Sequence, residues 1–183
     1  MMNTTRVNPI VQLPSGIDSL RLGVDRETVK LAAAGDVRDV AVALATQAQR
    51  TLLLHTQDLE ARIYDRQPFL DAVSALVRRQ PGACFDVLIQ DVDRVVKDGH
   101  RLVELARRLG SSIQIRRCPR QYRGYCGTFL LVDDSGYLYR PLSSRYEGLA
   151  SFNNASEVAR LGKYFREVWE HSDTEMELRR LYL

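Results

Sequence analysis

The side chains best suited to acid–base chemistry are three histidines, and the first of them closes an apolar run. His55 stands near the end of Thr51 to Thr56 (TLLLHT), a run typical of a strand covered on both faces. Asp91 closes the next such run, and ligands of open α/β sheets bind beyond the carboxyl ends of strands. His55 and Asp91 are therefore candidates for a shared site. A histidine that only caps a strand by hydrogen bonding fits the same pattern.

The other two histidines stand at predicted helix ends. His100 follows Gly99 at the start of a predicted helix, where the helix dipole would lower its pKa, and it is a further catalytic candidate. His171 stands at the end of the last predicted helix, where a positive charge is favoured. We expect a structural or solvated role for His171.

A short arginine-rich segment, residues 116–123 (RRCPRQYR), contains no acidic residue. Its members are Arg116, Arg117, Arg120 and Arg123. Because guanidinium groups bind phosphate and carboxylate in a bidentate manner, we predict an anion-binding role, with a solvated loop as the alternative. The net charge of +3 does not by itself indicate a nucleic-acid protein, since such proteins usually concentrate a basic face.

Several kinds of site are not indicated. The three cysteines, Cys84, Cys118 and Cys126, form no C-x-x-C pair, so neither a disulfide framework nor a zinc site is expected. The sequence also lacks the G-x-x-x-x-G-K-[ST], G-x-G-x-x-G, G-x-S-x-G and H-E-x-x-H motifs. We therefore expect no metal and no cofactor.

Length and composition favour a single core. A chain of 183 residues with 45% hydrophobic content can build one core and is short for two. Its apolar runs are far shorter than the roughly 20 residues that span a bilayer, and the first residues lack the apolar stretch of a signal peptide. We expect a cytoplasmic protein with no membrane span, a flexible N-terminal arm at residues 1–25 and one domain at 26–183.

The elements that must position these residues follow from hydrophobic periodicity. Strands are predicted at 51–56, 84–91, 113–116 and 146–152, with a hairpin at 128–140 turning at Ser135 and Gly136. Helices are predicted at 26–49, 68–79, 100–109 and 155–170, the last with Asn154 and Glu157 in a capping-box arrangement. The alternation predicts an α/β fold, namely a mixed, largely parallel sheet with helices on both faces and antiparallel edges from the hairpin.

The order of these segments, with the hairpin GTFLLVDDSGYLYR, resembles a single-domain member of the phospholipase D superfamily, close in layout to its small bacterial nucleases. The resemblance covers about residues 36–171. In that family the hairpin carries H-x-K-x-x-x-x-D followed by G-S-x-N, and two copies, usually from two subunits, form one site. The histidine forms a phospho-enzyme bond, while lysine and asparagine hold phosphate oxygens. The chain also resembles a bacterial domain found alone or behind an acetyltransferase domain, although the coenzyme A loop Q-x-x-G-x-[GA] is missing.

Carried onto this chain, the family motif loses its chemical groups. If Asp133 matches the aspartate, Cys126 stands in place of the histidine and Thr128 in place of the lysine. Glu147 matches an acid on the following strand, and the G-S position is lost. Cys126 could act as a nucleophile only if nearby arginines lowered its pKa. Phosphoryl transfer through a covalent intermediate needs a nucleophile and cations for the phosphate oxygens, so we expect no enzyme activity.

The sequence therefore predicts a catalytically silent phospholipase D-like module, a pseudoenzyme that binds an anionic ligand or a protein partner. One alternative is a divergent phosphodiesterase or nuclease that uses His55 or His100, and another is a structural partner of an acyltransferase. A phosphate-containing ligand or nucleic acid is a possible partner. A homodimer is expected, because a lone hairpin would expose the aromatic patch of Tyr125, Phe129, Tyr137 and Tyr139.

Overall fold

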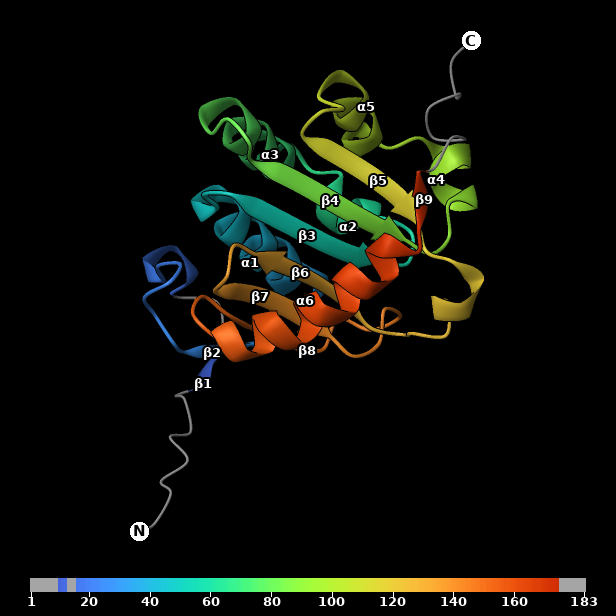
Figure 1. The fold of residues 1–183 in the computed structure, drawn as a ribbon. Coiled ribbons are helices and arrows are strands. Elements are labelled where there is room, and N and C mark those ends of the chain that lie inside the picture. Colours follow the sequence, from blue (N-terminus) through green and yellow to red (C-terminus); the bar gives the residue numbers. More distant parts are fainter. Residues whose placement is uncertain (1–9, 13–15, 175–183) are drawn as a thin grey trace.

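Strands and helices alternate along most of the chain (Figure 1). The computed structural model describes residues 10–12 and 16–174. The strands are β1 (Ile10–Gln12), β2 (Thr28–Leu31), β3 (Thr51–Thr56), β4 (Cys84–Ile89), β5 (Ile113–Arg117), β6 (Thr128–Val132), β7 (Gly136–Arg140), β8 (Gly148–Ser151) and β9 (Asp173–Thr174). The helices are α1 (Ala34–Gln47), α2 (Ala61–Tyr64), α3 (Gln67–Arg79), α4 (Asp93–Asp98), α5 (Arg101–Arg108) and α6 (Ala155–Glu170), with 3-10 turns η1 (Ile17–Ser19) and η2 (Arg120–Tyr122).

The strands of the described residues form one mixed sheet in the order β1-β2-β8-β7-β6-β3-β4-β5-β9. The predicted fold class, α/β with a mixed sheet and helices on both faces, is confirmed, but the prediction of a largely parallel sheet is wrong. Parallel pairing is limited to β1 with β2 and to β3, β4 and β5, so antiparallel pairs outnumber parallel ones. The reason is that the β6–β7 hairpin lies inside the sheet and not at its edge. Its side chains are almost all buried, and only a central position covers both of its faces.

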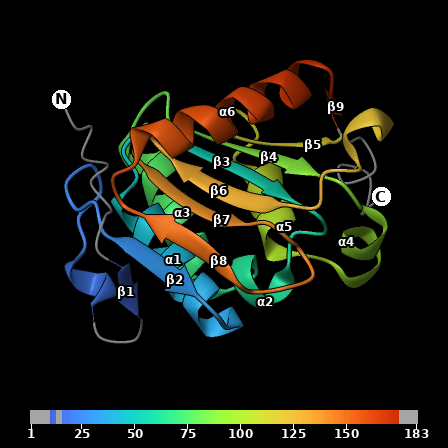
Figure 2. The same cartoon turned by 90° about the horizontal axis from the view of Figure 1, so that it is seen from below.

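Helices lie on both faces of the sheet (Figure 2). The side chains of β3 and its neighbours alternate between the two hydrophobic clusters under these helices. Leu52 and Leu54 face the larger hydrophobic cluster, which also contains apolar residues of α1, α3 and α5. Leu53 faces the smaller cluster beneath α6, where Leu131 of β6 lies beside it in the antiparallel ladder. Because one sheet separates the two clusters, the helices of both layers are held against the same strands.

Helix α6 begins as predicted and covers the hairpin. The Asn154 side chain caps it by accepting a hydrogen bond from the backbone N–H of Glu157 at 3.1 Å. Under α6, Phe129 is fully buried and Tyr137 is 5% exposed. The predicted exposed aromatic patch is therefore wrong, because the chain's own last helix packs on that face. Trp169, at the end of α6, is only partly buried.

The N-terminal part differs from the predicted helix at residues 26–49. Residues Thr28–Leu31 form β2, and the helix begins at Ala34. Pairing with β8 buries Val29 and Leu31, which outweighs the helical spacing of that short segment. The described residues before β2 contact the core through Ile17, Leu20 and Leu22, while residues 1–9 and 13–15 of the predicted arm lie outside the described residues. None of the helices in the described part of the chain has the length and apolar character needed to span a bilayer.

The predicted hairpin turn is also one residue longer than expected. Val132 pairs with Gly136, so Asp133, Asp134 and Ser135 form the turn and Gly136 already belongs to β7. Asp133 adopts a left-handed conformation with φ of 50°. Asp tolerates this conformation better than most residues, which explains why no glycine is needed at that position.

Candidate functional site

His55 is fully enclosed between the sheet and α6. Its ring stacks on Phe129 with ring centroids 5.2 Å apart, and Tyr125 and Tyr164 meet it edge-on at 5.3 and 5.7 Å. Nδ1 donates to the carbonyl of Gly127 at 3.1 Å, and Nε2 lies 3.4 Å from the side-chain amide of Gln90. Both ring nitrogens therefore have partners, and no face of the imidazole is open to solvent.

Burial controls the charge of His55 and separates it from Asp91. Desolvation lowers the pKa of His55 to about 4, against an opposing contribution from its hydrogen bond to Gly127, so the ring is neutral at neutral pH. Asp91 is exposed, and its carboxylate accepts from the backbone N–H of Asp93 at 3.1 Å. The two predicted partners do not meet, because α6 and its aromatic side chains enclose His55 while Asp91 faces solvent.

His100 has a different environment, although it too is buried, with 6% of its surface exposed. It caps α5, since its Nδ1 accepts from the backbone N–H of Leu102 at 3.1 Å. Burial lowers the pKa of His100. Because Nδ1 accepts a hydrogen bond, Nε2 is the nitrogen that carries the ring proton. The Leu59 carbonyl and nearby carboxylates oppose this shift, but within the described residues Nε2 forms no hydrogen bond of good geometry.

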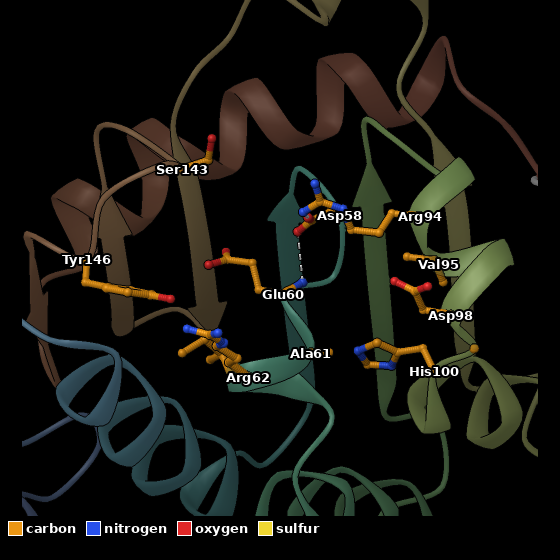
Figure 3. A pocket seen from close by; sticks show the side chains of 12 residues that line it. Asp58, Glu60, Ala61, Arg62, Arg94, Val95, Asp98, His100, Ser143 and Tyr146 are labelled. Atoms are coloured by element: carbon orange, nitrogen blue, oxygen red, sulfur yellow. Dashed lines mark hydrogen bonds and ion pairs between the residues drawn. The ribbon is translucent and has the colours of Figure 1, made fainter.

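A pocket of about 410 Å³ lies beside His100 (Figure 3). Three chain segments form it: residues 58–63 after β3, residues 94–100 after β4, and the β7–β8 connection with Ser143 and Tyr146. The first two follow the carboxyl ends of adjacent parallel strands, the usual location of ligand sites in α/β sheets. This volume lies in the range of small-molecule sites.

The wall of the pocket contains a buried ion pair that the sequence analysis missed. Arg140 is fully buried at the end of β7, donating to Glu60 Oε2 at 2.7 Å and to the carbonyl of Ser143 at 2.7 Å. Burial raises the pKa of Glu60, and the Arg140 guanidinium opposes that shift. Oε1 of Glu60 is buried without a hydrogen-bond partner among the described residues. Tyr146 packs on the guanidinium, 5.3 Å from Arg140 Cζ to the ring centroid.

Backbone geometry supports the position of this pair. Leu59 and Glu60 both have positive φ, 61° and 37°, which costs about 1–3 kcal/mol for each non-glycine residue. Gly148 on β8 allows Arg140 to pack closely, because a Cβ at that position would lie 2.7 Å from Arg140 Cγ and clash with the carbonyl of Tyr139. Close packing around Arg140 therefore keeps its guanidinium beside the Glu60 carboxylate, and the surrounding contacts offset the strain at residues 59 and 60.

The residues at the four matched positions of the phospholipase D motif have different environments. Thr128 is 1% exposed and donates to the carbonyl of His55 at 2.7 Å, whereas Cys126 is exposed with its Sγ 3.6 Å from the carbonyl of Gly124. The Asp133 carboxylate accepts three backbone N–H groups, from residues 49, 50 and 51, at 2.8–2.9 Å. Glu147 is exposed just before β8 and does not line the pocket.

The four predicted anion-binding arginines do not converge. Arg116 and Arg117 are consecutive on β5 and point to opposite faces of the sheet. Arg116 lies 4.2 Å above the Trp169 ring and donates to the carbonyl of Trp169 at 3.1 Å. Arg117 lies 3.9 Å from the carboxylate of Asp93. Arg116 therefore links α6 to the sheet, and Arg117 lies within ion-pair distance of α4 on the other face.

Arg120 and Arg123 are the exposed members of the segment, in and directly after η2. Arg123 donates from Nε to the carbonyl of Cys118 at 3.3 Å, which leaves the end of its guanidinium accessible. The buried Cys118 has its pKa raised to about 12 by burial, with Arg123 opposing, so it is not a thiolate at neutral pH.

In the described residues no group of three or more His, Cys, Asp or Glu side chains could hold a metal.

Comparison with known proteins identifies a family and a fold. A family model described as a domain of unknown function (DUF7931) matches residues 33–181. No curated protein sequence matches the chain significantly.

Solved structures of three kinds are similar at low sequence identity. The archaeal chromatin protein TrmBL2, described as showing a novel mode of DNA binding, gives a TM-score of 0.60 at 15% identity over 86% of this chain and 56% of its own. The phospholipase D family member Nuc from Salmonella typhimurium gives a TM-score of 0.56 at 12% identity, over 79% of this chain and 94% of its own. Phosphatidylserine synthase from Haemophilus influenzae Rd KW20 gives a TM-score of 0.55 at 13% identity, over 85% of this chain and 40% of its own. The chain thus spans about half or less of the chromatin protein and the synthase, and the likeness shows a phospholipase D-like fold.

Proposed function

The chain belongs to the family described as a domain of unknown function, DUF7931, and from its phospholipase D-like fold we propose a catalytically silent binding or regulatory module. The ligand is an anionic molecule or a protein partner. The observation that carries the proposal is the state of the hairpin, where a buried, hydrogen-bonded Thr128 and the thiol of Cys126 stand in the places of the motif's lysine and histidine.

The retained aspartate supports this proposal. Asp133 holds the backbone of residues 49–51 through three hydrogen bonds, a role that needs no catalytic neighbour. A chain that keeps this group and lacks the cation and nucleophile needed for phosphoryl transfer can keep the fold without the reaction. His55 offers no substitute, because both of its ring nitrogens are already hydrogen-bonded beneath α6.

Hydrolysis assays test the proposal directly. We expect no turnover of bis-p-nitrophenyl phosphate or single-stranded DNA, with or without divalent metal, and no change in the Cys126→Ala variant. Turnover that His100→Asn abolishes would contradict the proposal and support a divergent phosphodiesterase. His100 is the favoured residue for that second function because, unlike His55, it lines a pocket.

Anion binding by the exposed arginines is the part of the proposal closest to nucleic acid, and the DNA-binding chromatin protein of similar fold fits it. Arg120 and Arg123 are available for such contacts. Titration of fluorescent single-stranded DNA should show weak binding that falls as salt rises, and a double Arg120→Ala, Arg123→Ala variant should lose it. The matched control replaces two exposed arginines elsewhere, Arg26 and Arg66. Binding that is unaffected by salt, or equal in both double variants, would exclude this surface.

The proposal also includes two protein partners, a second copy of this chain and an acyltransferase. With α6 covering the hairpin, a homodimer would use another surface, and light scattering at tens of micromolar should give a dimer mass if the prediction holds. An acyltransferase partner is tested by co-purification of the chain with the candidate enzyme. If the chain is a monomer in solution and does not co-purify with an acyltransferase, both protein partners are excluded. Binding of a small anionic ligand then remains as the proposed function.

A further inference from the structure

The pocket beside His100 contains hydrogen-bonding groups that the described protein leaves unused. His100 Nε2 is a donor and Glu60 Oε1 is an acceptor; the Leu59 carbonyl lies near the first and the Thr128 hydroxyl near the second, but neither atom forms a hydrogen bond of good geometry among the described residues. Burying such a group without a good hydrogen bond is unfavourable. A polar ligand that offers an acceptor to His100 and a donor to Glu60 would recover that free energy on binding.

Unpaired charges stand on two sides of the same pocket. Arg62 of α2 and Asp98 of α4 are both exposed, and neither side chain forms an ion pair or hydrogen bond in the part of the chain that the structure describes. Figure 3 shows Arg62 on the side of Glu60 and Tyr146, and Asp98 on the opposite side with His100. The remaining charged groups of the lining, Asp58 and Arg94, already form an ion pair at 2.5 Å.

We propose that this pocket binds a small zwitterion of amino-acid or dipeptide size, with its carboxylate at Arg62 and its ammonium group at Asp98. The inner polar groups of the ligand would then pair with His100 Nε2 and Glu60 Oε1. This inference rests on the proposed function of a non-catalytic binding module; it names the site and replaces the general anionic ligand with one that also carries a cation. The volume of about 410 Å³ accommodates such a molecule with room for a side chain.

The charge of the lining favours a zwitterion over a simple anion. Asp58 is paired with Arg94 and Glu60 with Arg140, so the unpaired charges of the lining are one guanidinium group, from Arg62, and one carboxylate, from Asp98. A dianion would bring its second negative charge toward the Asp98 carboxylate, and like charges in a partly desolvated site repel strongly. A ligand with one charge of each sign meets an oppositely charged side chain at both ends.

Binding assays with defined probes test the assignment. The full chain is mixed with each of the twenty common L-amino acids and a set of alanine-containing dipeptides at about 5 mM, and thermal unfolding is followed before calorimetric titration of those that stabilise it. We expect at least one probe to raise Tm. Its N-acetyl form, which lacks the cation, and its amide form, which lacks the anion, should each bind at least about tenfold more weakly. No stabilisation by any probe, or equal binding of both blocked forms, overturns the proposal.

Variants locate the site. Arg62→Ala and Asp98→Asn should each weaken binding about tenfold or more, while Arg78→Ala on α3 and Asp39→Asn on α1 provide exposed controls outside the pocket. His100→Asn keeps a helix cap and removes the Nε2 donor, so it should weaken binding while the protein stays folded. Unchanged affinity in all three pocket variants would overturn the site. A negative binding result leaves the silent-module proposal standing on the hydrolysis assay, whereas turnover would reject that proposal whatever the probes do.

Discussion

The region under α6 and the pocket beyond β3 and β4 each contain a buried histidine of lowered pKa, yet they differ in what the histidine touches. His55 is surrounded by aromatic rings and both of its nitrogens are hydrogen-bonded. His100 uses one nitrogen to cap α5 and leaves the other unpaired beside an open pocket. Burial and a pKa shift alone therefore do not identify a functional histidine, and unused hydrogen-bonding capacity next to a cavity is the more selective sign.

The largest expected effect in this comparison comes from the pocket wall. Arg140→Met should lower the free energy of unfolding by about 3–5 kcal/mol, because it leaves the buried Glu60 carboxylate without its cation. Urea denaturation measures the change, with Arg145→Met as the control at an exposed arginine of the β7–β8 connection. A loss equal to that of the control would mean that the pair does not hold the pocket.

Removing the enclosed histidine should have the next largest effect. His55→Ala deletes a ring that stacks on Phe129 and leaves the Gly127 carbonyl unpaired, so we expect a loss of about 2–4 kcal/mol. The exposed His171→Ala serves as control. If His55→Ala instead leaves stability unchanged and alters ligand binding, the distinction between the two regions fails.

The pH dependence of stability sharpens the comparison further. With a folded pKa of about 4 against 6.5 unfolded, His55 binds its proton more readily in the unfolded state, so its contribution is complete above pH 6.5 and is lost as pH falls toward 4. The full loss is about 3 kcal/mol. Burial raises the pKa of Asp86 to about 6, which stabilises the fold as pH falls and partly offsets this loss. The measurement is therefore the difference between wild type and His55→Gln across pH 4–7, and a flat difference would contradict it.

The smallest effect on stability is expected at the pocket histidine. His100→Asn should cost less than about 1 kcal/mol, because asparagine also caps helices and Nε2 has no partner to lose. Thermal denaturation provides the comparison with His55→Gln. A loss as large as that of His55→Gln would show that the unpaired nitrogen contributes to the fold and is not reserved for a ligand.

Local sequence patterns predicted most helices and strands. The wrong predictions lie where long-range contacts decide the structure. The apolar runs of β3 to β6 and the Asn154 cap could be read directly, since burial on both faces and capping leave local signals. Residues 28–31 became a strand only through pairing with β8, which no local spacing reveals. The carboxyl ends of β3 and β4 indicated where a site would lie, although the residue named there, His55, points to the closed face.

The pocket residues themselves could not be found from the sequence. Glu60 looks like any loop acid, and its partner Arg140 is 80 residues away along the chain. An arginine at the end of a strand is usually solvated, so nothing local predicts its complete burial. The one available signal was the conjunction of Gly148 with the aromatic Tyr146, which is too common in loops to interpret without the fold.

The Asp133 carboxylate has a consequence for the order of folding. Its three hydrogen bonds join the hairpin turn to backbone groups 82–84 residues earlier, so they can form only when both ends of a very long segment have met. The β3–β4 ladder closes a much shorter segment and carries less loop-closure entropy. We therefore expect β3 and β4 to pair early and the hairpin to dock late. The hydrogen bonds of Asp133 would then mainly slow unfolding, because the hairpin cannot leave the native sheet until they break. They would contribute little to the folding rate.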